Sequence, residues 1–265
     1  DNLFFYNKTQ NMLLTLDIGN TNIVIGLFKG EKLINKWRVI SDDNKLTDDY
    51  AVDLVELFLT EKIDCLQISG AIIGSVVPSL TSKLHEAVKK FTNCNILVVG
   101  EADVKLNIDI HIKNKNEVGA DRLINGIAAY KKFGGDLIIL DFGTATTFDV
   151  LIKNVYSGGI IAPGVRLSLN TLSDKATLIP KIDLKKIKNV IGINTISAVR
   201  SGFFWGYAGL IDNIIYLIKK ETRKSFRVII TGGFSDLFKK SIKTKVKQNK
   251  DITINGLIKI SKLIK

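Results

Sequence analysis

The first half of the chain alternates between strongly apolar runs and segments in which apolar residues recur with helical spacing. Residues 13–28 form two apolar runs around a tight turn with the sequence IGNTN, a pattern that predicts a β-hairpin. Residues 48–60 combine a broad apolar face with early acidic residues, which predicts a helix. The same reasoning predicts strands over residues 32–40, 67–77 and 95–99, and a helix over residues 80–91. This order is typical of an α/β domain.

The second half repeats the start of the first. An apolar run over residues 137–140 ends in Asp141 and is followed by a Gly-Thr turn and a second strand, as the first run is at Asp17. The two aspartates are 124 residues apart, which indicates a duplicated domain rather than a short repeat. Further elements are predicted over residues 119–132 (helix), 157–162 (strand), 193–220 (helix), 227–231 (strand) and 252–265 (strand and helix). Both halves are therefore expected to be α/β, with residues 12–118 and 119–265 as the two domains.

Charge does not by itself indicate a nucleic-acid-binding protein. The chain has 38 basic and 26 acidic residues and a net charge of +12, but 14 basic and 3 acidic residues fall in residues 219–265. The basic residues are 32 Lys and only 6 Arg, whereas bidentate recognition of phosphates and guanines favours Arg. We interpret the excess as a solvated surface, and expect neither nucleic acid nor membrane as a partner.

Composition also limits the cellular setting. Hydrophobic residues make up 46% of the 265 residues, enough to bury a sizeable core. The two cysteines and two histidines have no zinc-site spacing, which favours a reducing cytoplasm. The longest uncharged stretch, residues 65–82, is too polar for a membrane span, and the start has no signal-peptide pattern. We expect Met12 to be the native start and residues 1–11 to be a non-native or disordered extension.

An Asp at a strand end followed by a Gly-Thr turn is suited to binding phosphate and a cation. Glycine lets the backbone approach an anion closely, N–H groups and hydroxyls donate hydrogen bonds, and the carboxylate holds a hydrated cation. One such turn is equally consistent with an ordinary loop, but two copies at equivalent positions of a duplicated fold predict a polyphosphate site. The P-loop and dinucleotide-binding fingerprints are absent from the sequence, and Asp141-Phe142-Gly143 is a chance match to a protein-kinase motif.

Two further motifs allow more than one interpretation. Gly119-Ala120-Asp121-Arg122 begins a predicted helix with a carboxylate in its first turn, which is either a functional acid or a stabilising charge at the helix N-terminus. Gly232-Gly233 follows an apolar strand and is either a turn that a flat ring approaches or simply a turn.

Together these motifs closely resemble those of type III pantothenate kinases, in order and spacing. They are DIGNTNIVIG (residues 17–26), EVGADRLIN (117–125), LDFGTATTFD (140–149), SGGIIAPG (157–164), GINT (192–195), SGFFWGYAGLID (201–212) and TGG (231–233). The resemblance implies the fold of the acetate and sugar kinase and actin superfamily, with two duplicated ribonuclease-H-like domains and a nucleotide cleft between them. It implies a cytoplasmic homodimer that phosphorylates pantothenate with ATP, the first step of coenzyme A biosynthesis.

The resemblance also implies roles for individual residues. Asp121 would be the general base, Asp17 would lie near the divalent metal and triphosphate, and Asp141 would coordinate a monovalent cation, K⁺ or NH₄⁺. The divalent cation would be Mg²⁺ or an equivalent ion, bound with ATP. Nucleotide would be bound by Asp17, Ile18, Gly19, Asn20, Thr21, Asn22, Ile23, Val24, Thr144, Gly232 and Gly233. Pantothenate would be bound by Gly119, Ala120, Asp121, Arg122, Thr195 and the residue at position 112.

The chain departs from the family pattern next to this substrate motif. Where the family usually has a tyrosine that contacts substrate and a proline three residues later, this chain has Ile112 and Lys115. Two alternatives therefore remain: a regulatory or accessory protein of the same fold, with the basic C-terminal region as its binding surface, and a kinase of this fold acting on another small alcohol.

Overall fold

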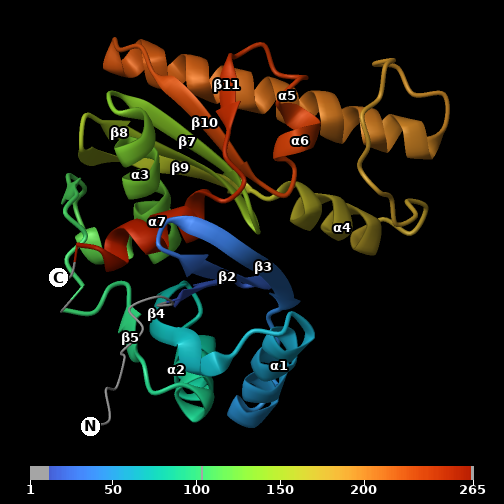
Figure 1. The fold of residues 1–265 in the computed structure, drawn as a ribbon. Helices are drawn as coiled ribbons and strands as arrows, with labels where there is room; N and C mark the ends of the chain where they lie inside the picture. The colour runs from blue at the N-terminus through green and yellow to red at the C-terminus, as the bar shows by residue number, and fades with distance from the viewer. Residues whose placement is uncertain (1–11, 103, 264–265) are drawn as a thin grey trace, which may run out of the picture. The chain divides into compact units, whose positions relative to one another are not determined.

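The computed structural model describes residues 12–102 and 104–263, so the expected extension over residues 1–11 lies outside it (Figure 1). The described chain forms two compact units. Unit 1 contains the residues up to Asn107, Asn116–Ala128 and the residues from Thr253; unit 2 contains Ile108–Lys115 and Ala129–Ile252. The sequence analysis expects two ribonuclease-H-like domains that meet near residue 118. This domain boundary stays a prediction.

Unit 1 is built on a mixed sheet with the strand order β3-β2-β1-β4-β5. The hairpin β1–β2 and the pair β2–β3 are antiparallel, whereas β4 lies parallel to β1 and β5 parallel to β4. The strands are β1 (Met12–Ile18), β2 (Asn22–Lys29), β3 (Lys32–Ile40), β4 (Ile68–Ser75) and β5 (Asn95–Val98). The predicted hairpin and the predicted strands over residues 32–40, 67–77 and 95–99 are thus confirmed.

Helices close both faces of this sheet. Tyr50, Leu54 and Phe58 of α1 (Thr47–Thr60) and Leu80 and Leu84 of α2 (Pro78–Phe91) share one core with the buried residues of β1. The short helix η1 (Cys65–Gln67) leads from α1 into β4. On the other side, α7 (Ile252–Ser261) packs Ile254 and Ile258 against Phe28 of β2.

Unit 2 repeats this topology with one additional edge strand. Its sheet has the order β11-β10-β7-β8-β9-β6, in which β7–β8 and β8–β9 are antiparallel and β10 and β11 are parallel to β7 and β10. The strands are β6 (Asp109–Ile110), β7 (Leu137–Phe142), β8 (Ala145–Ile152), β9 (Val155–Pro163), β10 (Arg227–Gly232) and β11 (Val246–Gln248). The series β9-β8-β7-β10-β11 matches β3-β2-β1-β4-β5, which confirms the predicted duplication.

The remaining helices are η2 (Lys115–Glu117), α3 (Ala120–Phe133), α4 (Val165–Lys175), α5 (Thr195–Thr222) and α6 (Ser235–Phe238). The side chain of Asn194 caps α5 by accepting a hydrogen bond from the Ser197 N–H at 2.9 Å. Buried residues of α5, such as Phe204, Ile211 and Ile215, share a core with β7 and β10. None of the described helices is long and apolar enough to cross a membrane.

The sequence-based prediction was wrong at the C-terminal end. A strand was expected after residue 252, but the last strand is β11, and the chain from Ile252 to Ser261 is the helix α7. Ile252 and Ile254 alternate as in a strand, whereas Ile254, Leu257 and Ile258 follow helical spacing and are all buried. The helical pattern prevails because it gives one continuous apolar face. The helices α4 and α6 were not predicted.

A glycine sets how closely α7 approaches α3. A Cβ atom at Gly256 would lie 2.5 Å from Ile124 Cγ2 and 2.7 Å from the Ile124 carbonyl oxygen. We therefore expect Gly256→Ala to lower the free energy of unfolding by about 1–3 kcal/mol, because a rigid backbone atom cannot move aside. Urea unfolding measures this. In the control Gly209→Ala on α5, the new methyl group meets no atom within 4 Å. Equal stability of the two variants would contradict the close packing.

Candidate functional site

The first Asp-Gly-Thr turn lies at the end of the central strand of unit 1. Asp17 is half-buried in β1 and pairs with Val24 on β2 and with Gly74 on β4. The turn closes through a hydrogen bond in which the Gly19 N–H donates to the Asn22 carbonyl at 3.0 Å. The carboxylate thus lies at the carboxyl end of a parallel strand pair, the edge at which open α/β sheets bind ligands.

The residues 17–24 of the predicted phosphate loop differ in burial: some are fixed in the core and others are exposed to solvent. Ile18 and Ile23 are completely buried and hold the two strand ends in the core. Asn20 and Thr21 are exposed at the tip, and Gly19, Asn22 and Val24 are half-buried. The groups able to meet a ligand are therefore polar side chains and backbone at the turn.

The N-terminus of α3 lies at the same edge of the unit 1 sheet. The Val76 N–H, one residue past β4, donates to the Ile18 carbonyl at 3.1 Å. A Cβ atom at Gly119 would lie 3.3 Å from Val76 Cγ1, so the residue preceding α3 packs directly on this strand end. The structure therefore brings the Asp17 turn and the Gly119–Arg122 motif to one edge of one sheet.

Asp121 is a half-buried carboxylate at that helix end. Burial raises the pKa of Asp121 above its ordinary value, while the backbone N–H and the positive charge of Arg122 act in the opposite direction. The Arg122 N–H donates to Asp121 Oδ1 at 2.8 Å. A Cβ atom at Gly119 would lie 2.6 Å from the same oxygen, so a side chain at position 119 would displace the carboxylate. A partly buried carboxylate at a helix N-terminus can take up a proton, so Asp121 is a candidate general base.

The second Asp-Gly-Thr turn occupies the equivalent place in unit 2. Asp141 of β7 pairs with Thr147 on β8 and Thr231 on β10, and the Gly143 N–H donates to the Ala145 carbonyl at 3.0 Å. Thr144 is exposed at the tip. The second turn therefore presents the same kinds of groups as the first.

Gly232 and Gly233 lie against Asp141. Gly232 has a φ of +83°, and a Cβ atom there would lie 2.5 Å from Asp141 Oδ1 and 2.5 Å from the Phe142 nitrogen. The Gly233 N–H donates to the Phe142 carbonyl at 3.0 Å. Only glycine permits both this backbone conformation and this approach, so the structure brings the Asp141 and Gly232-Gly233 motifs together.

The other two predicted substrate residues occupy other parts of unit 2. Thr195 is exposed as the first residue of α5. Ile112 is half-buried beyond β6, where its Cγ2 would lie 3.8 Å from a Cβ atom on Gly158 of β9. Neither belongs to the segment that forms the second turn.

Two residues that contact these turns were given no role there by the sequence analysis. Ser41, which follows β3, donates from Oγ to the Gly19 carbonyl at 2.6 Å. Gly164, which follows β9, comes so close that a Cβ atom there would lie 2.0 Å from the Thr144 carbonyl oxygen. The only available signal was that both follow the third strand of a predicted repeat.

The described residues contain no group of three or more His, Cys, Asp and Glu side chains that could hold a metal ion. The carboxylates of Asp17 and Asp141 nevertheless fit hard cations whose remaining ligands are water and phosphate oxygens. The donor chemistry therefore suits Mg²⁺ or K⁺ bound together with a nucleotide, and does not suit a protein-enclosed metal centre.

Comparison with solved structures establishes the fold class. A putative 2-dehydro-3-deoxygalactonokinase from Sinorhizobium meliloti aligns with a TM-score of 0.61 at 10% identity, over 95% of this chain and 96% of its own. A conserved putative Baf family transcriptional activator from Campylobacter jejuni aligns with a TM-score of 0.55 at 19% identity, over 94% and 98% of the two chains. At such low identities the likeness shows the fold alone, that of the sugar kinases and actin-like ATPases.

Comparison of sequences establishes the family. The model of a family described as type III pantothenate kinase matches residues 13–216. A type III pantothenate kinase of Pelagibacter ubique is 54% identical over 96% of this chain and 100% of its own length. Another, from Paramagnetospirillum magneticum, is 42% identical over 94% of this chain and 96% of its own. The chain therefore belongs to the type III pantothenate kinase family.

Proposed function

We propose that this protein transfers the γ-phosphoryl group of ATP to the primary hydroxyl of pantothenate, giving 4′-phosphopantothenate and ADP in the first step of coenzyme A biosynthesis. The observation that carries the proposal is the half-buried Asp121 carboxylate at the same edge of the unit 1 sheet as the Asp17 turn. Relatives that are 54% and 42% identical are named for this activity. We place the enzyme in the cytoplasm, where ATP is available.

The phosphate groups are assigned to the two turns. Residues 17–24 bind them with backbone N–H groups and the Thr21 hydroxyl, Thr144 does so from the second turn, and Gly232 and Gly233 lie by the adenosine. Asp17 holds the divalent ion through water or phosphate, and Asp141 holds K⁺ or NH₄⁺. When bound, the divalent ion neutralises charge on the phosphate oxygens. Phosphoryl transfer demands mainly positioning and charge neutralisation, which these side chains supply.

Asp121 performs the proton transfer. It accepts the proton of the pantothenate hydroxyl as the oxygen attacks the γ-phosphorus, and burial makes it a stronger base than an exposed aspartate. The Arg122 N–H fixes the carboxylate, since it donates to Oδ1 at 2.8 Å. The Arg122 guanidinium either pairs with the pantothenate carboxylate or helps to orient Asp121.

The remainder of the pantothenate site is assigned to Gly119, Ala120, Thr195 and Ile112. Ile112 cannot offer the flat face or hydroxyl of a tyrosine, so pantothenate is held without the usual aromatic contact. This substitution is the observation that favours the second candidate, a kinase of this fold acting on another small alcohol.

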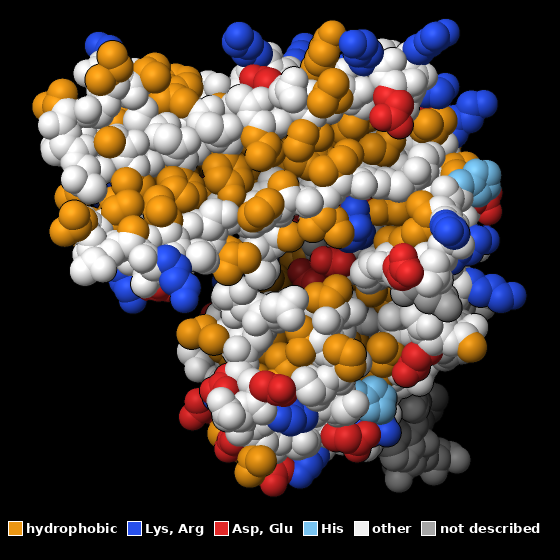
Figure 2. Space-filling model, turned by 180° about the vertical axis from the view of Figure 1, so that it is seen from behind, with side chains coloured by type: hydrophobic (Ala, Val, Ile, Leu, Met, Phe, Trp, Pro, Cys, Tyr) orange, Lys and Arg blue, Asp and Glu red, His pale blue; other side chains and the backbone are white. Residues whose placement is uncertain are grey.

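We also propose that the protein is a homodimer in which Thr195 contacts the pantothenate of the partner subunit. Large apolar side chains are exposed in the segment before α5 and at its start, among them Leu178, Ile191 and Ile193, which are 89%, 84% and 93% exposed. Figure 2 shows hydrophobic side chains gathered over this part of unit 2. Patches of this kind on soluble proteins mark protein interfaces.

The activity is tested by following ADP release with and without pantothenate, in potassium and in sodium salts. We expect pantothenate-dependent ADP formation that is faster in potassium, because the carboxylate of Asp141 binds a weakly hydrated cation beside the nucleotide. Other small alcohols in place of pantothenate test the second candidate. An ADP rate that pantothenate does not raise in either salt would contradict the proposed function.

The base assignment is tested with Asp121→Asn. We expect kcat to fall by about 10²- to 10⁴-fold, the usual contribution of a general base. The exposed Asp109 provides the matched control Asp109→Asn, which should leave kcat unchanged. In the wild type, kcat/KM should fall as the pH is lowered, because protonated Asp121 cannot accept a proton. The midpoint of this fall should lie above about pH 4, the ordinary Asp value, because burial raises the pKa of Asp121.

Stability provides a second measurement on the same variant. A raised pKa means that the folded state holds the Asp121 proton more tightly than the unfolded chain does, so stability is lost as the pH rises through the folded-state value. Asp121→Asn should therefore raise the melting temperature at pH 7, and this gain should vanish below about pH 4. An inactive variant that melts below the wild type at pH 7 would point to disrupted folding instead of a lost base.

The dimer is tested with Ile193→Asp. A carboxylate buried between two subunits would be strongly unfavourable, so we expect light scattering to show monomers and the KM for pantothenate to rise. Leu66, which is 86% exposed in unit 1, gives the matched control Leu66→Asp. A wild type that is monomeric at micromolar concentration, or a variant that stays dimeric, would refute the assignment.

A further inference from the structure

Ser41 connects the end of β3 to the first phosphate turn by two hydrogen bonds. Its Oγ donates to the Gly19 carbonyl at 2.6 Å, and its backbone N–H donates to the Thr21 carbonyl at 3.1 Å. The Gly19 N–H in turn donates to the Asn22 carbonyl at 3.0 Å. One half-buried residue thus holds two carbonyl groups of a three-residue turn.

These bonds determine which way the turn presents its donors. In a planar trans peptide the carbonyl and the following N–H point in opposite directions. Since the Gly19 carbonyl accepts from Ser41, the Asn20 N–H of the same peptide points away from Ser41. Glycine has the largest conformational freedom of any residue, so without Ser41 the peptide after Gly19 could rotate readily.

The residue after Ser41, Asp42, is held by a buried tyrosine of α1. The Tyr50 hydroxyl accepts a hydrogen bond from the Asp42 N–H at 3.0 Å and donates one to the Asp42 carbonyl at 2.8 Å. Tyr50 is only 1% exposed and belongs to the unit 1 core. The residue next to Ser41 is therefore attached to the rigid interior.

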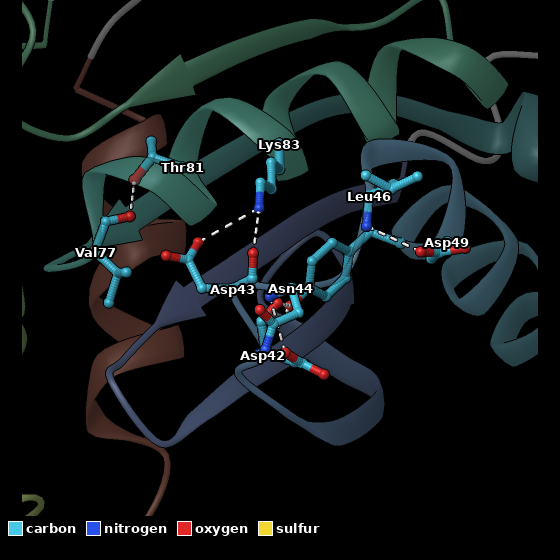
Figure 3. Close-up of polar contacts among 9 residues, drawn as sticks. Asp42, Asp43, Asn44, Leu46, Asp49, Val77, Thr81 and Lys83 are labelled. Carbon is cyan, nitrogen blue, oxygen red and sulfur yellow. Dashed lines mark hydrogen bonds and ion pairs between the residues drawn. The ribbon is translucent and has the colours of Figure 1, made fainter.

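A second attachment comes from α2. Lys83 Nζ donates to the Asp43 carbonyl at 2.5 Å and lies 3.4 Å from Asp43 Oδ1, as Figure 3 shows. The Asn44 N–H donates to Asp42 Oδ1 at 2.9 Å, which closes the segment on itself. Both α1 and α2 thus hold the segment from which Ser41 reaches the turn.

The second turn has a different support at the equivalent place. Asn22 pairs with Ile40 in unit 1, and Ala145 pairs with Pro163 in unit 2, so Ser41 and Gly164 follow the third strand in the same register. At Gly164 the Thr144 carbonyl approaches so closely that no side chain fits. The hydroxyl of Ser41 is therefore specific to the first turn.

We propose that Ser41 is a positioning residue for the triphosphate of ATP, which rests on the function proposed above. It holds the peptide after Gly19 in the orientation that binds phosphate before the nucleotide arrives. The entropy of ordering the turn is therefore lost when the protein folds and not when ATP binds. Tyr50 acts through Ser41 by holding Asp42. Ser41 itself does not touch the reacting atoms.

The test compares Ser41→Ala and Ser41→Thr in the full-length protein. MgATP binding by titration calorimetry and KM values for both substrates are measured, together with melting temperatures. We expect Ser41→Ala to weaken MgATP binding by about five- to tenfold, the worth of one hydrogen bond, with the KM for pantothenate unchanged. Ser41→Thr keeps a hydroxyl and should restore most of the affinity. Tyr50→Phe should weaken MgATP binding by a smaller factor.

Ser69→Ala is the matched control. Ser69 Oγ likewise donates to a backbone carbonyl, that of Met12 at 3.2 Å, but Met12 lies at the end of β1 away from the turn. A purely structural role for Ser41 would lower the melting temperature and change both KM values together. That result, or a MgATP affinity of Ser41→Ala equal to that of Ser69→Ala, would overturn the proposal.

The calorimetry separates this proposal from the proposed function. Suppose that the wild type binds MgATP, that Ser41→Ala weakens this binding, and that pantothenate yields no ADP. The positioning role is then supported and the proposed pantothenate activity is refuted. If pantothenate is phosphorylated and Ser41→Ala binds MgATP as tightly as the wild type does, the proposed activity is supported and the positioning role is refuted. A wild type that binds no MgATP would refute both.

Discussion

The arrangement of the unit 1 site depends on how far the parallel pairing of β1 and β4 extends. The strands pair through Ile18 and Ser75, and the Val76 N–H donates to the Ile18 carbonyl just beyond them. This extension fixes Val76, against which Gly119 packs, and so fixes where α3 begins. The Asp17 turn and the Asp121 carboxylate are thereby placed by one backbone register, which a slip of one residue would destroy by turning the buried side chains outward.

Glycine residues make the close approaches that such sites need. Gly119 leaves room for Asp121 Oδ1 and Gly232 leaves room for Asp141 Oδ1, with hypothetical Cβ contacts of 2.6 and 2.5 Å. In both units a carboxylate therefore lies against backbone that carries no side chain. Glycine loses more conformational entropy on folding than other residues do, so packing elsewhere must offset this cost. The large hydrophobic cores of the two units supply that stabilisation.

The sequence predicts those features that local pattern determines. The hairpin at residues 13–28 and the strand over residues 32–40 follow from apolar runs and turn residues, and the duplication follows from the two aspartates. The roles of Ser41 and Gly164 could not be found in this way, because they depend on the register in which the third strand of each repeat pairs with the second, which local pattern does not set. The helix α7 was mistaken in part for a strand because Ile252 and Ile254 alternate, and only packing against Phe28 selects the helix.

The net charge of +12 and the chemistry of Asp121 act over different distances. Exposed lysines are screened over roughly 8–10 Å at physiological ionic strength, so the excess in residues 219–265 acts mainly on the approach of anionic ATP and pantothenate. The protonation of Asp121 is instead governed by burial and by the adjacent Arg122. The lysine content can therefore vary widely without altering the protonation of Asp121, whereas a single change at Gly119 or Arg122 acts on this carboxylate directly.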